Sequence, residues 1–206
     1  MLEVKNASLQ IGGGRLFHDL SFAVGDGEML CVTGPSGSGK TTLLRALLGF
    51  LPLDGGYISI DGELLTPSSV GEFRKTMAYV PQDVAMPAER VGDICSLLAG
   101  LRANRGAVFS RERLVAEWGM LGLDASLYDK PVAALSGGEL RRVALSVCGL
   151  LKKKIVLADE PASGLDPDAA CLVADYLRRM ASAGCSVVAV SHDPAFAASC
   201  DRVVTL

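Results

Sequence analysis

The amino-acid sequence predicts an α/β fold in which helices cover a mostly parallel sheet. First, a glycine-rich turn at residues 34–39 separates an apolar strand from a helix. Second, apolar strands and helical segments alternate between residues 154 and 190. Third, residues 91–151 follow a helical pattern rich in Ala and Leu. Because 206 residues suffice for one sizeable core, we expect a single α/β domain with a mostly helical insertion at about residues 83–150.

The first part of the chain is expected to form short β segments followed by a helix. Residues 2–9 and 17–24 have the pattern of two β segments on either side of a glycine run at 12–14. The continuous apolar run at residues 29–32 is typical of a buried strand, and residues 42–48 have the pattern of a helix.

The later elements follow from the same periodicities. A strand at residues 57–60 ends at Asp61-Gly62, which is a strong turn signal. Pro81 closes a strand at residues 77–80, since proline donates no hydrogen bond to a sheet. The remaining elements that we expect are helices at 111–121, 140–151 and 169–183 and strands at 155–158 and 186–190.

Charge and hydropathy exclude several classes of protein. A formal net charge of −3, from 20 basic and 23 acidic residues, gives no general electrostatic case for binding nucleic acid. The basic run at residues 152–154 is expected to be a solvated loop. No apolar run approaches the roughly 18 residues that a membrane-spanning helix needs. Residues 1–6 lack the pattern of a secretory signal, so we expect a cytoplasmic location.

The six cysteines are scattered along the chain, with no C-x-x-C pair. Their spacing is not that of a metal site. Without an export signal, we expect reduced thiols that behave as small apolar side chains.

A phosphate-binding loop is the most specific motif in the chain. Residues 34–41, Gly-Pro-Ser-Gly-Ser-Gly-Lys-Thr, fill every fixed place of G-x-x-x-x-G-K-[ST] between a strand and a helix. Backbone N–H groups of such a loop cradle phosphate; Lys40 reaches the β- and γ-phosphates, and the Thr41 hydroxyl ligates Mg²⁺. The residues expected to bind the nucleotide here are Gly34, Pro35, Ser36, Gly37, Ser38, Gly39, Lys40, Thr41 and Thr42.

Two acidic residues close the apolar strand at 155–158. In parallel sheets, ligands gather at the carboxyl ends of the strands, where the phosphate loop also lies. Asp159 can hold Mg²⁺ there, directly or through water, and Glu160 can orient or deprotonate an attacking water molecule. The simpler interpretation is a plain Asp-Glu turn, which the preceding phosphate loop disfavours.

A Leu-Ser-Gly-Gly-Glu segment at residues 135–139 precedes the helix expected at 140–151. Ser136 is a good N-cap, and the N-terminus of a helix attracts anions through its free N–H groups and its dipole. Taken alone, this segment is only a capped helix after a glycine turn.

The order of these motifs resembles that in the ATP-binding subunits of ATP-binding-cassette (ABC) transporters, over essentially the whole chain. The motifs that carry the resemblance are Walker A at 34–42, the Q-loop at Gln82, the signature at 135–139, Walker B at 155–160, the D-loop at 163–166 and the switch histidine His192. The resemblance implies a P-loop NTPase of the ABC type, with a mostly parallel core, an N-terminal antiparallel β segment and a helical subdomain that carries the signature. It implies that residues 1–206 form one ABC ATPase domain, with 1–82 and 151–206 as the core and 83–150 as the helical subdomain.

The resemblance also implies roles for single residues. In the family two cassettes pair head to tail, and each ATP lies between Walker A of one and the signature of the other. Ser136, Gly137 and Gly138 would thus meet the nucleotide of a second copy, or of a paralogous cassette, and Asp166 would report the state of one site to the other. Splitting the contacts between two subunits makes hydrolysis depend on closure.

Three further residues receive catalytic roles by resemblance. Glu160 would be the general base, His192 would bridge the γ-phosphate to the catalytic centre, and Gln82 would sense Mg²⁺ and the attacking water. Taken alone, Gln82 is a polar loop residue and His192 belongs to a strand-ending turn. Arg141 and Arg142 follow the signature; we expect them on a solvated helix face rather than on the nucleotide.

One position departs from the family pattern. An aromatic residue that stacks on adenine is usual upstream of Walker A, and Ile11 occupies that place here. Ile11 can pack against a base but cannot stack on it, and Phe17 is the nearest aromatic and the candidate to take its place. We expect ATP as the bound nucleotide, with weaker selectivity against GTP than is usual in the family.

The favoured function is an energy-coupling subunit of a membrane transporter, peripheral on the cytoplasmic face of the cell membrane. A separate integral-membrane permease subunit would dock in a groove formed after Gln82; the same side chains can instead be core. The groove residues expected are Val84, Ala85, Met86, Pro87, Val91, Ile94, Leu97 and Leu98. The alternatives are a non-transport ABC ATPase, for cell-envelope remodelling or cofactor assembly, and an ATP-gated adaptor. We expect no added regulatory domain after residue 206, and the transported molecule is not encoded in these motifs.

Overall fold

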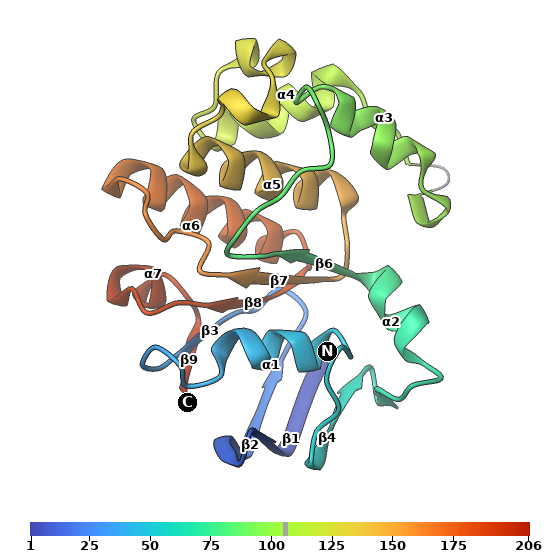
Figure 1. The fold of residues 1–206 in the computed structure, drawn as a ribbon, viewed down its shortest axis with the longest axis vertical. Coiled ribbons are helices and arrows are strands. Elements are labelled where there is room, and N and C mark those ends of the chain that lie inside the picture. Colours follow the sequence, from blue (N-terminus) through green and yellow to red (C-terminus); the bar gives the residue numbers. More distant parts are fainter. Residues whose placement is uncertain (105–106) are drawn as a thin grey trace.

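The computed structural model describes residues 1–104 and 107–206, and its elements form stacked layers (Figure 1). A parallel sheet of five strands lies at the centre, in the order β6-β7-β8-β3-β9. A separate antiparallel sheet has the order β2-β1-β4-β5, and α1 lies between the two sheets. The strands are β1 (Leu2–Ile11), β2 (Gly14–Val24), β3 (Met29–Thr33), β4 (Gly55–Ile60), β5 (Glu63–Leu64), β6 (Met77–Val80), β7 (Ile155–Asp159), β8 (Ser186–Val190) and β9 (Arg202–Thr205).

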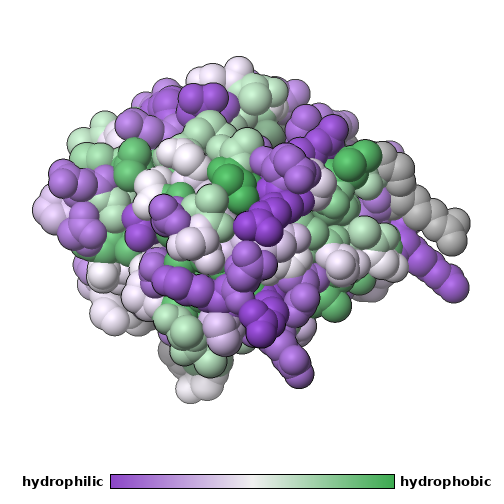
Figure 2. All heavy atoms as spheres, turned by 90° about the horizontal axis from the view of Figure 1, so that it is seen from above, coloured by the Kyte–Doolittle hydropathy of each residue, from purple (hydrophilic) through white to green (hydrophobic). Residues whose placement is uncertain are grey.

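Helices cover the other face of the parallel sheet, where α5 and α6 lie between the sheet and the outer helices α3 and α4 (Figure 1). The helices are α1 (Lys40–Leu47), α2 (Val70–Thr76), α3 (Asp93–Gly100), α4 (Arg111–Met120), α5 (Gly137–Leu151), α6 (Pro167–Ser182) and α7 (Pro194–Ala198). Short 3₁₀ turns lie at Arg102–Asn104, Ala125–Asp129 and Val132–Ala134. Seen from above, the molecule carries hydrophobic patches between hydrophilic side chains (Figure 2). In the parts of the chain that the structure describes, no helix is long and apolar enough to cross a membrane.

The central strands are buried on both faces, which explains why they are almost continuously apolar. Their side chains alternate between two cores, as the period of a strand requires. In β7, Val156 and Ala158 pack with the helices, whereas Ile155 and Leu157 pack with α1 and the antiparallel sheet. The sheet is therefore held from both sides, and its carboxyl edge is a rigid support for a site.

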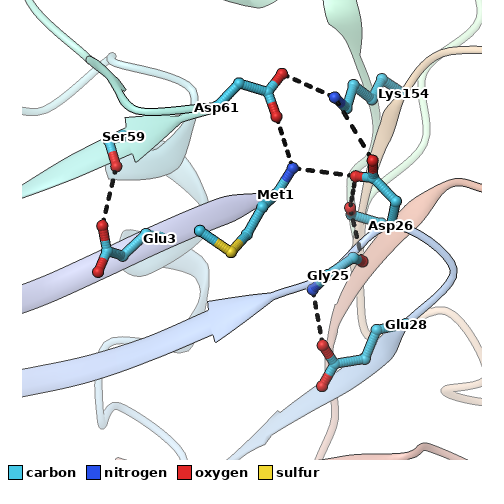
Figure 3. Close-up of polar contacts among 9 residues, drawn as sticks. Met1, Glu3, Gly25, Asp26, Glu28, Ser59, Asp61 and Lys154 are labelled. Atoms are coloured by element: carbon cyan, nitrogen blue, oxygen red, sulfur yellow. Dashed lines mark hydrogen bonds and ion pairs between the residues drawn. The ribbon is translucent and has the colours of Figure 1, made fainter.

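A polar junction ties the antiparallel sheet to the amino end of the parallel sheet (Figure 3). The Lys154 ammonium, just before β7, lies 2.7 Å from Asp61 and 3.8 Å from Asp26. The amino group of Met1 donates to the same two carboxylates, at 2.7 and 3.0 Å. Hydrogen bonds from Lys154 and Met1 lower the pKa of Asp61.

The predicted elements are present, with shifts at their ends. The helix expected from residue 140 begins at Gly137, because Ser136 and Glu139 form a capping box. The helix expected from residue 169 begins at Pro167, because Asp166 is its N-cap and proline is favoured at the first position. The prediction missed α2, α7 and the edge strands β5 and β9, which are short elements with weak periodicity.

Candidate functional site

The phosphate loop connects β3 to α1 and lines a cavity of about 450 Å³. Gly37 and Gly39 have φ of 82° and 98°, a conformation that costs other residues free energy. The loop residues that line the cavity are Gly34, Pro35, Ser36, Gly37, Gly39, Lys40, Thr41 and Thr42. Ser38 does not line it; its buried hydroxyl has no hydrogen-bond partner among the described residues. The loop is therefore shaped as an open nest at the N-terminus of α1.

Lys40 is 9% exposed and points back over its own loop. Its ammonium donates to the carbonyl oxygens of Gly34, at 2.9 Å, and Pro35, at 3.0 Å. These bonds hold the positive charge over the loop. Phosphate oxygens entering the cavity can take up the same donors.

Thr41 and Asp159 meet at the cavity although 118 positions separate them in the chain. The Thr41 hydroxyl donates to Asp159 Oδ1 at 3.1 Å, and the Tyr79 hydroxyl donates to Oδ2 at 3.4 Å. Burial raises the pKa of Asp159, and burial together with the nearby Asp159 charge raises the pKa of Tyr79 to about 12. Tyr79 was not predicted here, because it reaches Asp159 only through the parallel pairing of β6 with β7.

The pair of oxygen donors fits Mg²⁺, which prefers hard oxygen ligands. Within residues 1–104 and 107–206, no three His, Cys, Asp or Glu side chains gather as a metal cage. Thr41 and Asp159 alone would leave most of the coordination sphere to phosphate oxygens and water, as is usual for Mg²⁺ bound with a nucleotide.

Glu160 and His192 form a hydrogen-bonded pair at the same cavity. His192 Nδ1 lies 2.8 Å from Glu160 Oε1, and the His192 backbone N–H donates to Oε2 at 3.4 Å. Glu160 has φ of 48°, unusual for a residue with a side chain, and its N–H donates to the Val190 carbonyl at 2.9 Å. Such strain costs of order 1 kcal/mol or more and is typical of functional sites; the two contacts from His192 hold the carboxylate just past the end of β7. Gln82, just past β6, also lines the cavity.

The signature residues lie outside this cavity. Ser136 accepts from the Glu139 N–H at 3.2 Å, and Glu139 accepts from the Ser136 N–H at 2.7 Å. That backbone hydrogen bond lowers the pKa of Glu139. Ser136 and Gly137 are exposed, and Gly138 is half-buried. Ser136 is thus the N-cap, as predicted, and the signature residues do not line the cavity formed by the chain's own phosphate loop.

Two residues near the signature have structural partners. The exposed Asp166 caps α6 by accepting from the Ala169 N–H at 2.9 Å. The expectation that Arg141 and Arg142 lie on a solvated helix face is wrong. Arg141 donates to the carbonyls of Gln82 and Ser163, and Arg142 donates to the Leu121 carbonyl, because all three loop carbonyls face α5.

Ile11 does not line the cavity; it is 52% exposed at the end of β1, beside the Gly12-Gly13 turn. Phe17 is 6% exposed and packs in the core beneath the antiparallel sheet, which leaves its ring unavailable to a base. Leu16 lines the cavity instead and packs against Gly39. A base contact through Ile11 stays a prediction, and Leu16 is an apolar wall that sequence reasoning missed.

An apolar groove of about 390 Å³ lies beside the segment that follows Gln82. Seven of the eight residues expected for a docking groove line it, namely Val84, Ala85, Met86, Pro87, Ile94, Leu97 and Leu98. Val91 does not line it, because it is fully buried in the core. Tyr79 lines the groove and also bonds Asp159, so the groove adjoins the nucleotide cavity.

Comparison with known families decides what this geometry belongs to. The family model described as "ABC transporter" matches residues 17–163, which is more than half of the chain. The chain belongs to the ABC transporter family. The matched stretch includes the phosphate loop, Gln82, the signature and Glu160.

Curated relatives carry the same assignment. The chain is 35% identical over 210 residues to an Fe(3+) ions import ATP-binding protein of Streptomyces coelicolor, covering 100% of this chain and 59% of that protein. It is 32% identical to an energy-coupling factor transporter ATP-binding protein of Levilactobacillus brevis, covering 91% of this chain and 68% of the relative. The chain thus spans little more than half the length of the iron-import relative.

Solved structures show the same fold. An ATP-binding subunit of an ABC transporter superposes with a TM-score of 0.86 at 27% identity, covering 100% of this chain and 85% of that one. A dimeric bacterial ABC transporter cassette gives 0.85 at 25% identity, covering 100% and 94%, and was also solved after hydrolysis with ADP and Pi. These findings confirm the predicted cassette fold.

Proposed function

We propose that this chain is the ATP-hydrolysing subunit of a membrane transporter and works as a pair of cassettes joined head to tail. One observation carries the proposal: Lys40, Glu160 and His192 line one cavity, whereas none of the signature residues at the start of α5 lines it. Within a single chain, the phosphate loop therefore has no signature beside it, and the signature has no phosphate loop beside it. Head-to-tail pairing completes both halves at once.

The residues of the cavity account for hydrolysis of the γ-phosphate. The phosphate loop and Lys40 bind and orient the triphosphate, which is the main requirement of phosphoryl transfer. Thr41 and Asp159 would hold Mg²⁺, which supplies positive charge to the phosphate oxygens. Glu160 orients the attacking water molecule and accepts its proton, while His192 holds the carboxylate in place. Gln82 lies at the cavity wall, where it can contact the water and the metal.

The first test is Glu160→Gln with ATP and Mg²⁺. We expect turnover to fall by about a hundredfold or more, the usual effect of losing a general base. We also expect the variant to elute as an ATP-dependent dimer in size-exclusion chromatography, because it binds ATP but cannot hydrolyse it. The Glu160→Gln, Lys40→Ala double variant should stay monomeric. Wild-type turnover in Glu160→Gln, or a monomer at saturating ATP, contradicts the proposal.

The partner that we propose is an integral-membrane permease with a cytoplasmic helix that binds the apolar groove. The groove is open to solvent: Leu97 is 46% exposed and Leu101 is 54% exposed. Its neighbour Gln82 connects it with the nucleotide cavity, so a helix bound there would respond to ATP. The names of the relatives, an iron importer and an energy-coupling factor transporter, support a transport role on the cytoplasmic face of a membrane.

Affinity purification of Glu160→Gln with ATP from detergent-solubilised host membranes tests the partner. We expect a multi-span membrane protein in stoichiometric amount, and its loss when Leu97→Glu is added. Leu64→Glu is the matched control, since Leu64 is 52% exposed on β5, away from the groove. Recovery of a soluble complex or a single-span scaffold would instead favour a non-transport ABC ATPase.

A further inference from the structure

Arg141 joins three segments of the nucleotide-binding machinery. It lies on α5, after the signature, where its Nη2 donates to the Gln82 carbonyl at 3.0 Å and its Nη1 donates to the Ser163 carbonyl. We propose that Arg141 is a positioning residue that couples the chain's own nucleotide cavity to the surfaces it offers to a second copy. These surfaces are the signature and the turn at residues 163–166. The inference rests on the head-to-tail pair proposed above.

The guanidinium suits a bridge between two loops. Its donors lie in one rigid plane, so the two carbonyl oxygens are held in a set relative position. These carbonyls are 59 and 22 positions from Arg141 in the chain, and they belong to segments with little regular structure of their own. The Arg141 side chain is half-buried, and its Nε is shielded from water. A lysine has a single ammonium and no such fork.

A second contact fixes the signature to the same turn. A Cβ added at Gly138 would lie 2.8 Å from Leu165 Cδ2, so this signature glycine packs directly on the turn. The start of α5 is thus held on residues 163–166 by Gly138 and by Arg141. Movement of the turn must carry the signature with it.

The turn at residues 163–166 is itself hydrogen-bonded to the catalytic residues. The Ser163 N–H donates to the Glu160 carbonyl at 3.1 Å, and the Glu160 carboxylate bonds His192 at 2.8 Å. Gln82 completes the route, since it lines the nucleotide cavity. In a head-to-tail pair, a shift of Gln82 or Glu160 on ATP binding would move the signature that faces the other copy's ATP. The expected consequence is cooperative hydrolysis in ATP concentration.

The experiment compares Arg141→Gln with Arg142→Gln in the full chain. Arg142 is the matched control, because it is half-buried on the same helix but donates only to the Leu121 carbonyl, at 3.3 Å. For Arg141→Gln we expect kcat to fall about tenfold, which is a usual size of coupling between sites. We also expect the Hill coefficient for ATP to fall towards about 1. The melting temperature and the Kd of the monomer for ATP should stay near wild type. Arg141→Lys should give an intermediate kcat.

Three outcomes overturn the coupling role: a wild-type protein without cooperativity, a folded Arg141→Gln with unchanged kcat and Hill coefficient, or an equal loss in Arg142→Gln. If the head-to-tail pair itself does not form, a different experiment shows it. In that case Glu160→Gln fails to dimerise with ATP even though Arg141 is intact.

Discussion

The phosphate-loop end of the parallel sheet and the signature end of α5 differ in how much one chain supplies. At the phosphate loop, strands β3, β6, β7 and β8 deliver side chains to one cavity, and the buried Asp159 already bonds Thr41. At the signature, Ser136 and Glu139 bond each other, Gly137 is exposed and Gly138 is half-buried against Leu165, and none of these four residues lines the cavity. In the proposed head-to-tail pair, ATP binding and ATP hydrolysis therefore have separate requirements: one chain supplies the phosphate-loop end, and a second molecule supplies the signature.

The largest effect on ATP binding should come from Lys40→Ala, which alters the phosphate-loop end alone. A charged hydrogen bond contributes about 1.5–3 kcal/mol, so the Kd for ATP should rise at least about tenfold. Titration calorimetry on the monomer measures it, with Lys154→Ala as a control on a distant lysine. Undiminished binding by Lys40→Ala would refute the assignment of the loop.

Gly138→Ala alters the signature end alone. The added methyl group would lie 2.8 Å from Leu165 Cδ2, so the Leu165 side chain must shift at the turn of residues 163–166, on which the start of α5 packs. We expect the ATP-dependent dimer of Glu160→Gln to weaken by about tenfold, a modest share of the 1–3 kcal/mol typical of overpacking. The Kd of the monomer for ATP should not change. A loss of monomer binding would mean that the two ends are not separable.

Ile11→Tyr and Leu16→Ala sharpen the description of the phosphate-loop end at its base-binding side. A tyrosine at the exposed position 11 could stack on adenine, and stacking contributes about 1–3 kcal/mol per base, so we expect a lower Kd for ATP. Leu16→Ala should raise the Kd for ATP and GTP alike, since Leu16 lines the cavity without a polar group. An unchanged Kd in Ile11→Tyr would show that position 11 does not face the base.

The smallest effect should come from Asp61→Asn, at the polar junction shown in Figure 3. Asparagine tolerates the φ of 53° at this position, so the change removes charge alone. Exposed ion pairs contribute at most about 1 kcal/mol, so the free energy of unfolding at neutral pH should fall by less than that.

The pH dependence of the same variant has a defined sign. Because the pKa of Asp61 is lowered in the folded protein, its stabilisation is full above the ordinary carboxyl range and disappears as the pH falls through the lowered value. The difference between Asp61→Asn and wild type should therefore vanish in acid and shrink with salt. Denaturant unfolding at several pH values measures it, and a difference that grows in acid would contradict the ion pair.

Features that depend on neighbouring residues follow from the amino-acid sequence. The phosphate loop is a local strand, turn and helix, and the Ser136–Glu139 capping box lies within one helical turn, so both were predictable. The family pattern then placed Gln82, Glu160 and His192 in order along the chain. Helix ends shifted by a few residues because capping, rather than hydrophobic periodicity, decides where a helix begins.

Contacts between residues that are far apart in the sequence become visible in the tertiary structure alone. Tyr79 reaches Asp159 through the register of two parallel strands, and Leu16 reaches the cavity because the antiparallel sheet packs beside the phosphate loop. The sequence predicted Arg141 on a solvated helix face, whereas in the structure its guanidinium bridges the carbonyls of Gln82 and Ser163. Such contacts join residues far apart in the chain. They depend on packing and strand register, and periodicity along a single helix or strand carries no information about either.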